Sequence, residues 1–405
     1  MLFFLMFAAV MGAAHYYVWR RAVRSTTRPG RGRWIGTGVV VFLYLLLMAS
    51  LLVSGDGGGV LGVVVAWSGS IWLAGAFYFA LIMAVLEIPR LVLLRATRAR
   101  QVPAVVGAPD VAVETPDAVL ADQPADAGRR LFIARSLAVA GGVATAGVIG
   151  FGTTQALGGP VVKRVPVTLG KLDQRLSGYR IAVVSDIHLG PLLGRGHTER
   201  IVRMINEQQV DLVAIVGDLV DGTVEELGEA AAPLRDLVST HGSFFVTGNH
   251  EYYAGAEPWL AELERLGVNP LRNERLRIER AGASFDLAGV NDVTGEGFGD
   301  GADFARALDG RDTSTPVVLM AHQPVQVREA AKYGVDLQLS GHTHGGQMFP
   351  FHLVVGLQQP VRSGLETVDG TQVYTSNGAG FWGPPVRVGA PPDISVVELH
   401  HKFAG

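Results

Sequence analysis

The chain of 405 residues contains no cysteine. Disulfide bonds, thiolate metal sites and cysteine nucleophiles are therefore excluded. The chain also lacks a charge imbalance, because 34 Lys and Arg residues against 37 Asp and Glu residues leave a formal net charge of −3. A chain so close to neutrality gives no electrostatic reason to expect a nucleic acid as a partner.

Hydrophobic residues are abundant instead, at 48% of a chain that is long for one domain. This composition indicates that part of the chain lies in a membrane. A helix needs roughly 20 apolar residues to span a bilayer. The first of the predicted spans is the shortest, and no basic residues precede it, which argues against a cleaved secretory signal. The four predicted spans are Leu2–Val18, Ile35–Val53, Val60–Ile88 and Leu131–Leu157.

Arginine residues in the connecting loops predict the orientation of these spans. Six lie between Arg20 and Arg33, and six more lie between Arg90 and Arg130, whereas the Ser54–Gly59 turn has neither Lys nor Arg. Basic loops remain on the cytoplasmic side of a membrane. We therefore expect a multi-pass protein of the cytoplasmic membrane, with its N-terminus and everything after Leu157 on the extracytoplasmic side.

The spans divide the chain into regions. Residues 1–98 hold the first three spans, and residues 99–128, rich in Ala, Val, Pro and Asp, predict a disordered cytoplasmic linker without a packed core. Residues 129–160 hold the fourth span, and Arg129-Arg130 before it resembles a twin-arginine export signal. Two arginines that flank a membrane helix are the alternative interpretation. No cleavage site follows, so we expect this span to remain as an anchor before a domain at residues 165–402.

Five short apolar runs in that domain are each followed by Asp, His or Asn residues. Strands that are buried on both faces have continuous apolar sequences, and α/β sheets collect ligands at the carboxyl ends of their strands. We therefore expect these polar side chains to converge on one rim. The runs are Ile181–Val184, Leu212–Val216, Phe244–Val246, Val317–Met320 and Leu337–Leu339.

Amphipathic helices alternate with these strands. The spacing of apolar residues predicts helices over Thr198–Gln208, Glu225–Val238 and Pro258–Leu266. Such alternation indicates an α/β domain with a mixed sheet. The later strands are predicted to form a second sheet; they are Phe285–Val290, Gln372–Tyr374 and Ile394–Leu399.

Polar motifs follow the predicted strands in a fixed order. In chain order they are Asp186-Ile187-His188, Gly217-Asp218 with Asp221, Gly248-Asn249-His250-Glu251, His322 and Gly341-His342-Thr343-His344. These motifs resemble those of the calcineurin-like metallophosphoesterases, over about Val165–His401. The extended form Gly341–Gln347, with Asn377–Gly380 later, resembles a membrane-associated bacterial branch of that family. The resemblance implies a four-layer α/β/β/α sandwich, here preceded by an all-α membrane region of about four helices.

The resemblance also implies a site with two divalent metal ions. Mixed Asp, Asn and neutral His ligands suit Mn, Fe or Zn better than Ca. His250 would be the general acid for the leaving oxygen, and Asp221 and Glu251 would orient the ligands through hydrogen bonds. By the family pattern, Asp186, His188 and His344 hold one metal, Asn249, His322 and His342 hold the other, and Asp218 bridges them.

The substrate is less well specified by the residues. Tyr252 and Tyr253 follow His250 and are candidates to wall the cleft, with ordinary aromatic packing as the alternative. Arg387 is a candidate to contact an anionic substrate, with a surface arginine as the alternative. We expect a membrane-anchored hydrolase of phosphomonoesters, phosphodiesters or pyrophosphate bonds in an envelope or lipid-linked substrate. The alternatives are a metal-binding scaffold without turnover and a phosphoesterase at the cytoplasmic face.

Overall fold

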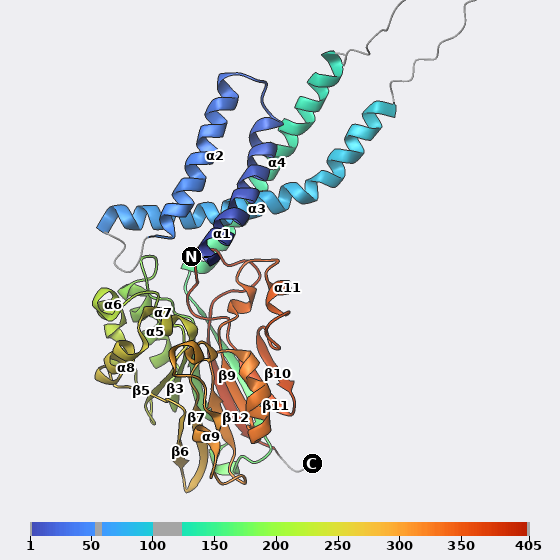
Figure 1. Cartoon of the computed structure of the whole chain (residues 1–405). Coiled ribbons are helices and arrows are strands. Elements are labelled where there is room, and N and C mark those ends of the chain that lie inside the picture. Colours follow the sequence, from blue (N-terminus) through green and yellow to red (C-terminus); the bar gives the residue numbers. More distant parts are fainter. Residues whose placement is uncertain (1, 53–58, 100–123, 403–405) are drawn as a thin grey trace, which may run out of the picture. The chain divides into compact units, whose positions relative to one another are not determined.

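The computed structural model describes residues 2–52, 59–99 and 124–402 (Figure 1). The chain divides into two compact units. The helical unit comprises Met1–Ser50 and Ser68–Gly150, and the sandwich unit comprises Leu51–Trp67 and Phe151–Gly405. Most of the predicted linker at residues 99–128 lies outside the described residues, although helix begins within it at Pro124.

Three helices of the described chain are long and apolar enough to cross a membrane, over Arg31–Ser50, Gly59–Arg95 and Gly128–Leu157. They agree with the second, third and fourth predicted spans. The first predicted span, Leu2–Val18, lies in α1, which is not among the three, and it stays a prediction. The helices are α1 (Leu2–Trp19), the π-helical η1 (Arg20–Arg24), α2 (Arg31–Ser50), α3 (Gly59–Ala99) and α4 (Pro124–Leu157).

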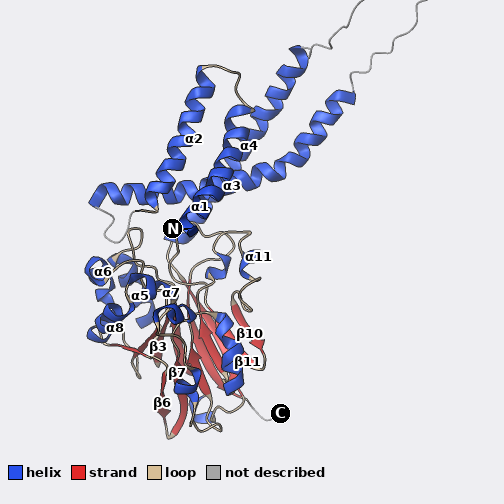
Figure 2. Ribbon diagram, in the orientation of Figure 1, coloured by secondary structure: helices blue, strands red, loops and turns tan. Residues whose placement is uncertain are grey.

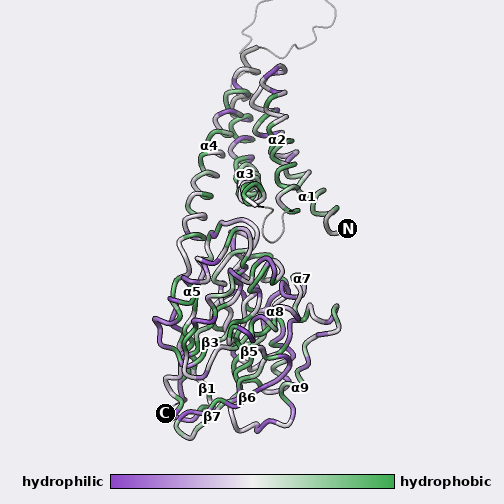
Figure 3. Tube along the Cα trace, turned by 90° about the vertical axis from the view of Figure 1, so that its left-hand side faces the viewer, coloured by the Kyte–Doolittle hydropathy of each residue, from purple (hydrophilic) through white to green (hydrophobic). Residues whose placement is uncertain are grey.

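Some polar side chains of the helical unit pair with one another. Trp72 Nε1 donates a hydrogen bond to His15 Nε2 over 2.8 Å, so both nitrogen atoms have a partner. Figure 3 shows hydrophobic residues recurring along the traces of α2, α3 and α4. Near the arginine-rich end, Arg21 Nη2 lies 2.6 Å from Glu87 Oε1. These pairs compensate polar groups that would otherwise be costly among apolar helices.

The first sheet of the sandwich unit has the strand order β1-β12-β2-β3-β4-β5. Its strands β2 to β5 are parallel, and β12 runs antiparallel to β2 and parallel to β1. The prediction that Ile394–Leu399 belongs to a second sheet is therefore wrong, because this segment lies in β12. The strands are β1 (Val161–Leu169), β12 (Asp393–His401), β2 (Tyr179–Val184), β3 (Leu212–Val216), β4 (Ser243–Val246) and β5 (Val268–Pro270).

The second sheet has the order β10-β11-β9-β8-β7-β6, and its central strands β11, β9, β8 and β7 are parallel (Figure 2). The predicted strands Phe285–Val290 and Gln372–Tyr374 belong here, as expected. The strands are β10 (Gly364–Val368), β11 (Thr371–Thr375), β9 (Leu337–Ser340), β8 (Val317–Met320), β7 (Ala283–Gly289) and β6 (Glu274–Arg280).

Three apolar layers hold the sandwich together. Ile181, Phe285 and Leu339 belong to the core between the two sheets. A second core lies between the first sheet and α5 (Arg195–Asn206), α6 (Val224–Ala231) and α8 (Ala256–Arg265), and a third lies between the second sheet and α9 (Phe304–Leu308) and α10 (Val327–Ala330). The four-layer α/β/β/α architecture is thus confirmed.

Short helices complete the unit. The helix predicted over Glu225–Val238 ends early, because Pro233 lacks an N–H and the chain continues as 3₁₀-helix η3 (Ala232–Asp236). The others are η2 (Gln174–Leu176), α7 (Asn249–Ala254), η4 (Val293–Phe298), η5 (Pro324–Gln326), η6 (Ala331–Tyr333), η7 (His344–Gly346) and α11 (His352–Val355).

Candidate metal centre

The motif residues stand at the carboxyl ends of strands from both sheets. Asp186 and His188 follow β2, and Asp218 follows β3, in the first sheet. His322 follows β8, and His342 and His344 follow β9, in the second sheet, while Asn249 begins α7 after β4. Because both sheets contribute residues, the site lies where the carboxyl ends of their strands come together.

One donor cluster consists of Asp186, His188 and His344. His188 Nε2 lies 3.1 Å from His344 Nε2, and His344 Nε2 lies 3.3 Å from Asp186 Oδ1. The side chains of His188 and Asp186 are fully buried. Three donor atoms from three positions of the chain therefore face one small volume.

The second donor cluster consists of Asp218, His322 and His342. His322 Nε2 lies 3.1 Å from Asp218 Oδ2, and the side-chain oxygen of Asn249 lies 3.0 Å from His342 Nδ1. Asp218 Oδ2 is also 3.8 Å from His188 Nε2 of the first cluster. Asp218 therefore stands between the two clusters.

The donor atoms of both clusters fit a cation. His322 Nδ1 lies 2.8 Å from the carbonyl oxygen of Val216, which can only accept, so this nitrogen carries the proton. If the His322 ring is neutral, its buried Nε2 carries a lone pair, and this lone pair faces the Asp218 carboxylate. Both groups can only accept a hydrogen bond, so neither satisfies the other. Two facing acceptors in a buried site require a positive charge, and His, Asp and Asn together are suitable ligands for Mn, Fe or Zn.

The electrostatics of the protein indicate the same charge requirement. Burial lowers the pKa of His188, but the nearby carboxylates of Asp221, Asp218 and Asp186 outweigh burial and raise it to about 9. Burial likewise opposes charge on His322, yet Asp218 raises its pKa well above the usual value. In the absence of metal, the carboxylates thus hold protons on the very nitrogens that face the two clusters.

Backbone strain is concentrated at the same residues. A positive φ in a residue other than glycine is uncommon and costs of order 1–3 kcal/mol. Gly378, at φ +80°, lies against Asp186, where an added Cβ would stand 2.6 Å from Asp186 Cβ, so the Asn377–Gly380 segment packs directly against Asp186. The positive φ angles are 51° at Asp186, 50° at His188, 51° at Asp218, 68° at His342 and 50° at His344.

Comparison with known proteins identifies this arrangement. The family model of calcineurin-like phosphoesterases matches residues 179–346, which include both donor clusters. A metallophosphoesterase of Helicobacter pylori is 43% identical over 254 residues, covering 62% of this chain and 67% of that protein. A metallophosphoesterase of Aquifex aeolicus is 36% identical over 227 residues, covering 55% of this chain and 85% of that protein. The chain belongs to the calcineurin-like metallophosphoesterases.

Calcineurin-like metallophosphoesterases are hydrolases that use divalent metal ions, and both donor clusters suit such ions. A further relative is a transmembrane protein with metallophosphoesterase domain from Danio rerio. It is 39% identical over 267 residues, which are 64% of this chain and 61% of that protein. The similarity to a transmembrane protein agrees with the three apolar helices found here.

Two carboxylates of this metallophosphoesterase form hydrogen bonds with residues of the donor clusters or with the backbone beside them. Glu251 is fully buried and accepts hydrogen bonds from the backbone N–H groups of Gly248, Asp218 and Leu219, over 2.6, 3.0 and 2.7 Å. Burial raises the pKa of Asp221, but the His188 and His250 rings outweigh it and lower this pKa to about 2. Asp221 is therefore ionised, and its Oδ1 lies 2.8 Å from His188 Nδ1.

The structure buries two of the substrate-binding candidates. Tyr252 is 6% exposed, and its hydroxyl donates to Asp300 over 3.0 Å, so it packs beneath the surface. Arg387 is 0% exposed and therefore cannot act as a surface arginine. Its Nη1 donates to the carbonyl oxygen of His344 over 2.8 Å, and its Nη2 lies 3.1 Å from His344 Nδ1. Arg387 thus fixes the position of His344, a member of the first donor cluster.

Two aromatic residues flank His250 instead. The ring centroid of Tyr253 lies 5.6 Å, and that of Trp382 5.9 Å, from the His250 ring. Both are more than half exposed, so they lie at the surface beside His250. The sequence predicted Tyr253 as a residue beside the site, because it follows His250 closely. It did not predict Trp382, because no motif or predicted strand lies directly before this residue.

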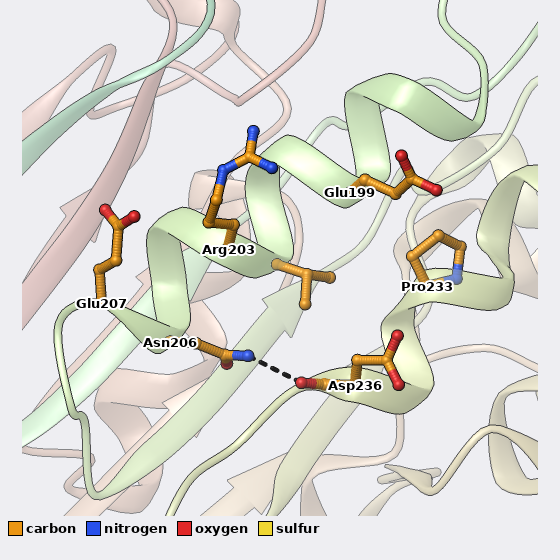
Figure 4. Close-up of a pocket in the computed structure, with 7 residues that line it drawn as sticks. Glu199, Arg203, Asn206, Glu207, Pro233 and Asp236 are labelled. Atoms are coloured by element: carbon orange, nitrogen blue, oxygen red, sulfur yellow. Dashed lines mark hydrogen bonds between the residues drawn. The ribbon is translucent and has the colours of Figure 1, made fainter.

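A separate hollow of about 480 Å³ lies between α5 and η3 (Figure 4). Its lining includes Glu199, Arg203 and Asp236, none of which belongs to the metal centre. Asn206 Nδ2 at its floor donates to the backbone oxygen of Asp236 over 2.7 Å. The hollow is a groove between two packed helices and holds none of the metal-binding residues.

Proposed function

We propose that the protein is a membrane-anchored phosphoesterase with a dinuclear metal site. The observation that carries this proposal is the place of Asp218 between two donor clusters, each fit for one cation. Asp186, His188 and His344 would hold one ion, Asn249, His322 and His342 the other, and Asp218 both. Two divalent ions would supply an activated water and neutralise charge on the phosphoryl oxygens.

His250 is the proposed proton donor to the leaving oxygen. Its backbone N–H donates to Asp218 Oδ1 over 2.9 Å, which fixes it beside the bridging carboxylate. Its ring is 16% exposed, so a substrate can reach it, and its Nδ1 lies 2.7 Å from Asp221 Oδ1. With Nδ1 so engaged, the opposite nitrogen is left to transfer a proton.

The catalytic region is proposed to lie on the extracytoplasmic side. The arginine-rich segment from Arg20 to Arg33 sets the cytoplasmic side. From there α2 crosses outward, α3 returns and α4 crosses outward again, whether or not α1 also spans the membrane. Residues after Leu157 are then outside. Phosphomonoesters, phosphodiesters or pyrophosphates of the envelope, including lipid-linked ones, would be within reach.

The test uses the full-length protein in detergent micelles. Bound metal and the hydrolysis of nitrophenyl phosphate and bis-nitrophenyl phosphate would be measured for the unaltered chain and for Asp218→Asn. We expect about two metals per chain and chelator-sensitive turnover, with both lost in the variant because Asp218 serves both clusters. His400→Ala is the matched control, because His400 is a histidine outside the clusters. Tightly bound metal without any turnover would favour the scaffold instead.

A further inference from the structure

A segment beside the metal centre exposes apolar side chains. Residues 345–361, between β9 and β10, contain no Asp, Glu, Lys or Arg. Contiguous exposed apolar patches on soluble domains mark interaction sites, whereas single exposed apolar residues do not. The most exposed is Leu357, at 87%. The exposed side chains of this segment are Phe349, Phe351, Leu353, Val354 and Leu357.

Trp382 joins this patch through Gln347. The side-chain nitrogen of Gln347 donates to the carbonyl oxygen of Trp382 over 2.8 Å, and Trp382 N–H donates to the side-chain oxygen of Gln347 over 3.1 Å. The indole is 57% exposed, and residues 370–386 around it are also without Asp, Glu, Lys or Arg. We call Phe349, Phe351, Leu353, Val354, Leu357 and Trp382 the apolar rim.

The segment is held in place at both ends, so its outward side chains are not the result of a loose loop. Phe349 N–H donates to the carbonyl oxygen of Val388 over 3.0 Å, and the Phe349 ring stacks on His352 with centroids 5.0 Å apart. At the other end, the buried Gln359 accepts from Val325 N–H over 2.9 Å. Gln359 thus faces inward, whereas the large apolar residues of the segment face solvent.

The apolar rim lies beside His250 of the metal centre. Trp382 is at once a member of the rim and a neighbour of His250, with ring centroids 5.9 Å apart. A molecule that contacts the rim with its apolar part can therefore place a polar group near His250. This is the geometry that an amphiphile requires, with its apolar chains on one side and its phosphoester on the other.

We propose that the apolar rim inserts into the surface of the lipid bilayer, and that the metal centre cleaves phosphoesters of amphiphiles that remain in that bilayer. The substrate half of this proposal rests on the function proposed above. We infer the bilayer as the partner of the rim from the connectivity of the chain. The apolar helix α4 ends at Leu157, and β1 of the sandwich begins at Val161. Trp and Phe side chains without neighbouring charges are suited to the membrane–water interface.

Bilayer contact can be measured directly, because the chain has no cysteine of its own. A nitroxide would be attached to Leu357→Cys in the full-length protein in phosphatidylcholine–phosphatidylglycerol vesicles. Val238→Cys is the matched control, as Val238 is an apolar residue of the sandwich unit that is 67% exposed and outside the rim. We expect the label at 357 to be relaxed by oxygen and shielded from a water-soluble nickel chelate, and the label at 238 to show the reverse.

Two results of this measurement would overturn the proposal. One is a label at 357 that is as accessible to nickel as the label at 238. The other is a label shielded from both relaxing agents whose spectrum broadens with protein density, because the rim would then bind a second copy of the chain. Both results are independent of any enzymatic activity.

The substrate half is tested with Leu357→Asp, which places a charge on a side chain that makes little contact with the protein. We expect hydrolysis of phosphatidic acid or phosphatidylglycerol in vesicles to fall about tenfold, because bilayer contact is weakened. Nitrophenyl phosphate hydrolysis should not change, and Val238→Asp should affect neither. For this variant, an equal loss on nitrophenyl phosphate and on the lipids, or no loss on the lipids, contradicts the proposal.

The unaltered chain separates this proposal from the proposed function. If it cleaves nitrophenyl phosphate but neither lipid, the substrate half alone is wrong. If it cleaves none of the three substrates, the proposed function is refuted, and the spin-label result still stands.

Discussion

Asp221 and His250 are joined through one carboxylate oxygen, since Asp221 Oδ1 lies 2.7 Å from His250 Nδ1. The same oxygen lies 2.8 Å from Nδ1 of the metal-site residue His188. A single ionised group therefore orients both a ligand and the proposed proton donor. Disturbing it should affect metal binding and proton transfer together.

Asp221→Asn should weaken both roles, and each role has its own measurement. The neutral amide fixes the His250 ring less well, so turnover at saturating metal should fall, and fall further for alkyl phosphates than for nitrophenyl phosphate. It also orients His188 less well, and metal affinity should fall about 10–100-fold. Both are measured on the full chain, by rates on the two substrates at saturating metal and by metal titration. Turnover that is unchanged at saturating metal would remove Asp221 from proton transfer.

His250→Ala should reduce turnover by about 10²–10⁴, because a general acid is lost, while metal content stays near that of the unaltered chain. The reduction should be larger for alkyl phosphates than for nitrophenyl phosphate, whose leaving group departs without a proton. Rates on both substrates, with metal analysis alongside, check this. Equal losses on the two would indicate a role in binding or structure.

Metal binding should release protons at neutral pH. The pKa of His188 is raised to about 9 and that of His322 well above its usual value, so both are protonated at pH 7 in the metal-free protein. A metal ion must displace these protons, so about two protons should leave per chain and affinity should rise as pH approaches 9. Titration of chelator-stripped protein in weak buffer measures this. An affinity that is flat across this range would show that the rings are already neutral.

Arg387→Lys should weaken the first metal cluster. A lysine carries one point charge and cannot replace the guanidinium, which donates to the carbonyl oxygens of His344 and Gly380. We expect one metal to be lost at concentrations where the unaltered chain keeps two. Arg306→Lys, at an exposed arginine of α9, is the control and should keep both. Retention of both metals in Arg387→Lys would limit this residue to packing.

The extracytoplasmic placement predicts the behaviour of reporter fusions. A reporter that is active only in the cytoplasm should be silent after Gly405 and active after Gly107, since α4 separates the two positions. Protease added to spheroplasts should release the part of the chain from β1 onward. Protection of this part with an active C-terminal reporter would instead favour the phosphoesterase at the cytoplasmic face.

Much of the fold could be predicted because the strands that precede the motifs have clear apolar sequences. Ile181–Val184 and Leu212–Val216 are continuous apolar runs, and each is followed by a motif with a defined order. Ile394–Leu399 is equally apolar, but an apolar run does not specify its partner strand, and it pairs with β1 and β2. β1 was not predicted, because Lys163 and Arg164 interrupt its apolar pattern at the edge of the sheet.

Side-chain exposure was the harder part of the site to predict. Arginine is ordinarily exposed, so the sequence favoured a surface position for Arg387. In the fold it is buried, and one of its carbonyl partners, His344, lies 43 residues away in the chain. The opposite holds for Leu353 and Leu357, which are apolar and would ordinarily be buried. Neither the burial of Arg387 nor the exposure of these leucines could be predicted from the sequence, because both depend on which segments meet in the folded chain.

Each donor cluster takes ligands from both sheets, and His188 and His344, 156 residues apart in the chain, meet only once the two sheets have closed on each other. An unfolded chain cannot carry ions in these positions. The compartment in which the domain folds is therefore the compartment whose supply decides which metals it contains. A chain that crosses the membrane before folding would be loaded from the envelope, whereas one exported already folded would carry cytoplasmic metals with it.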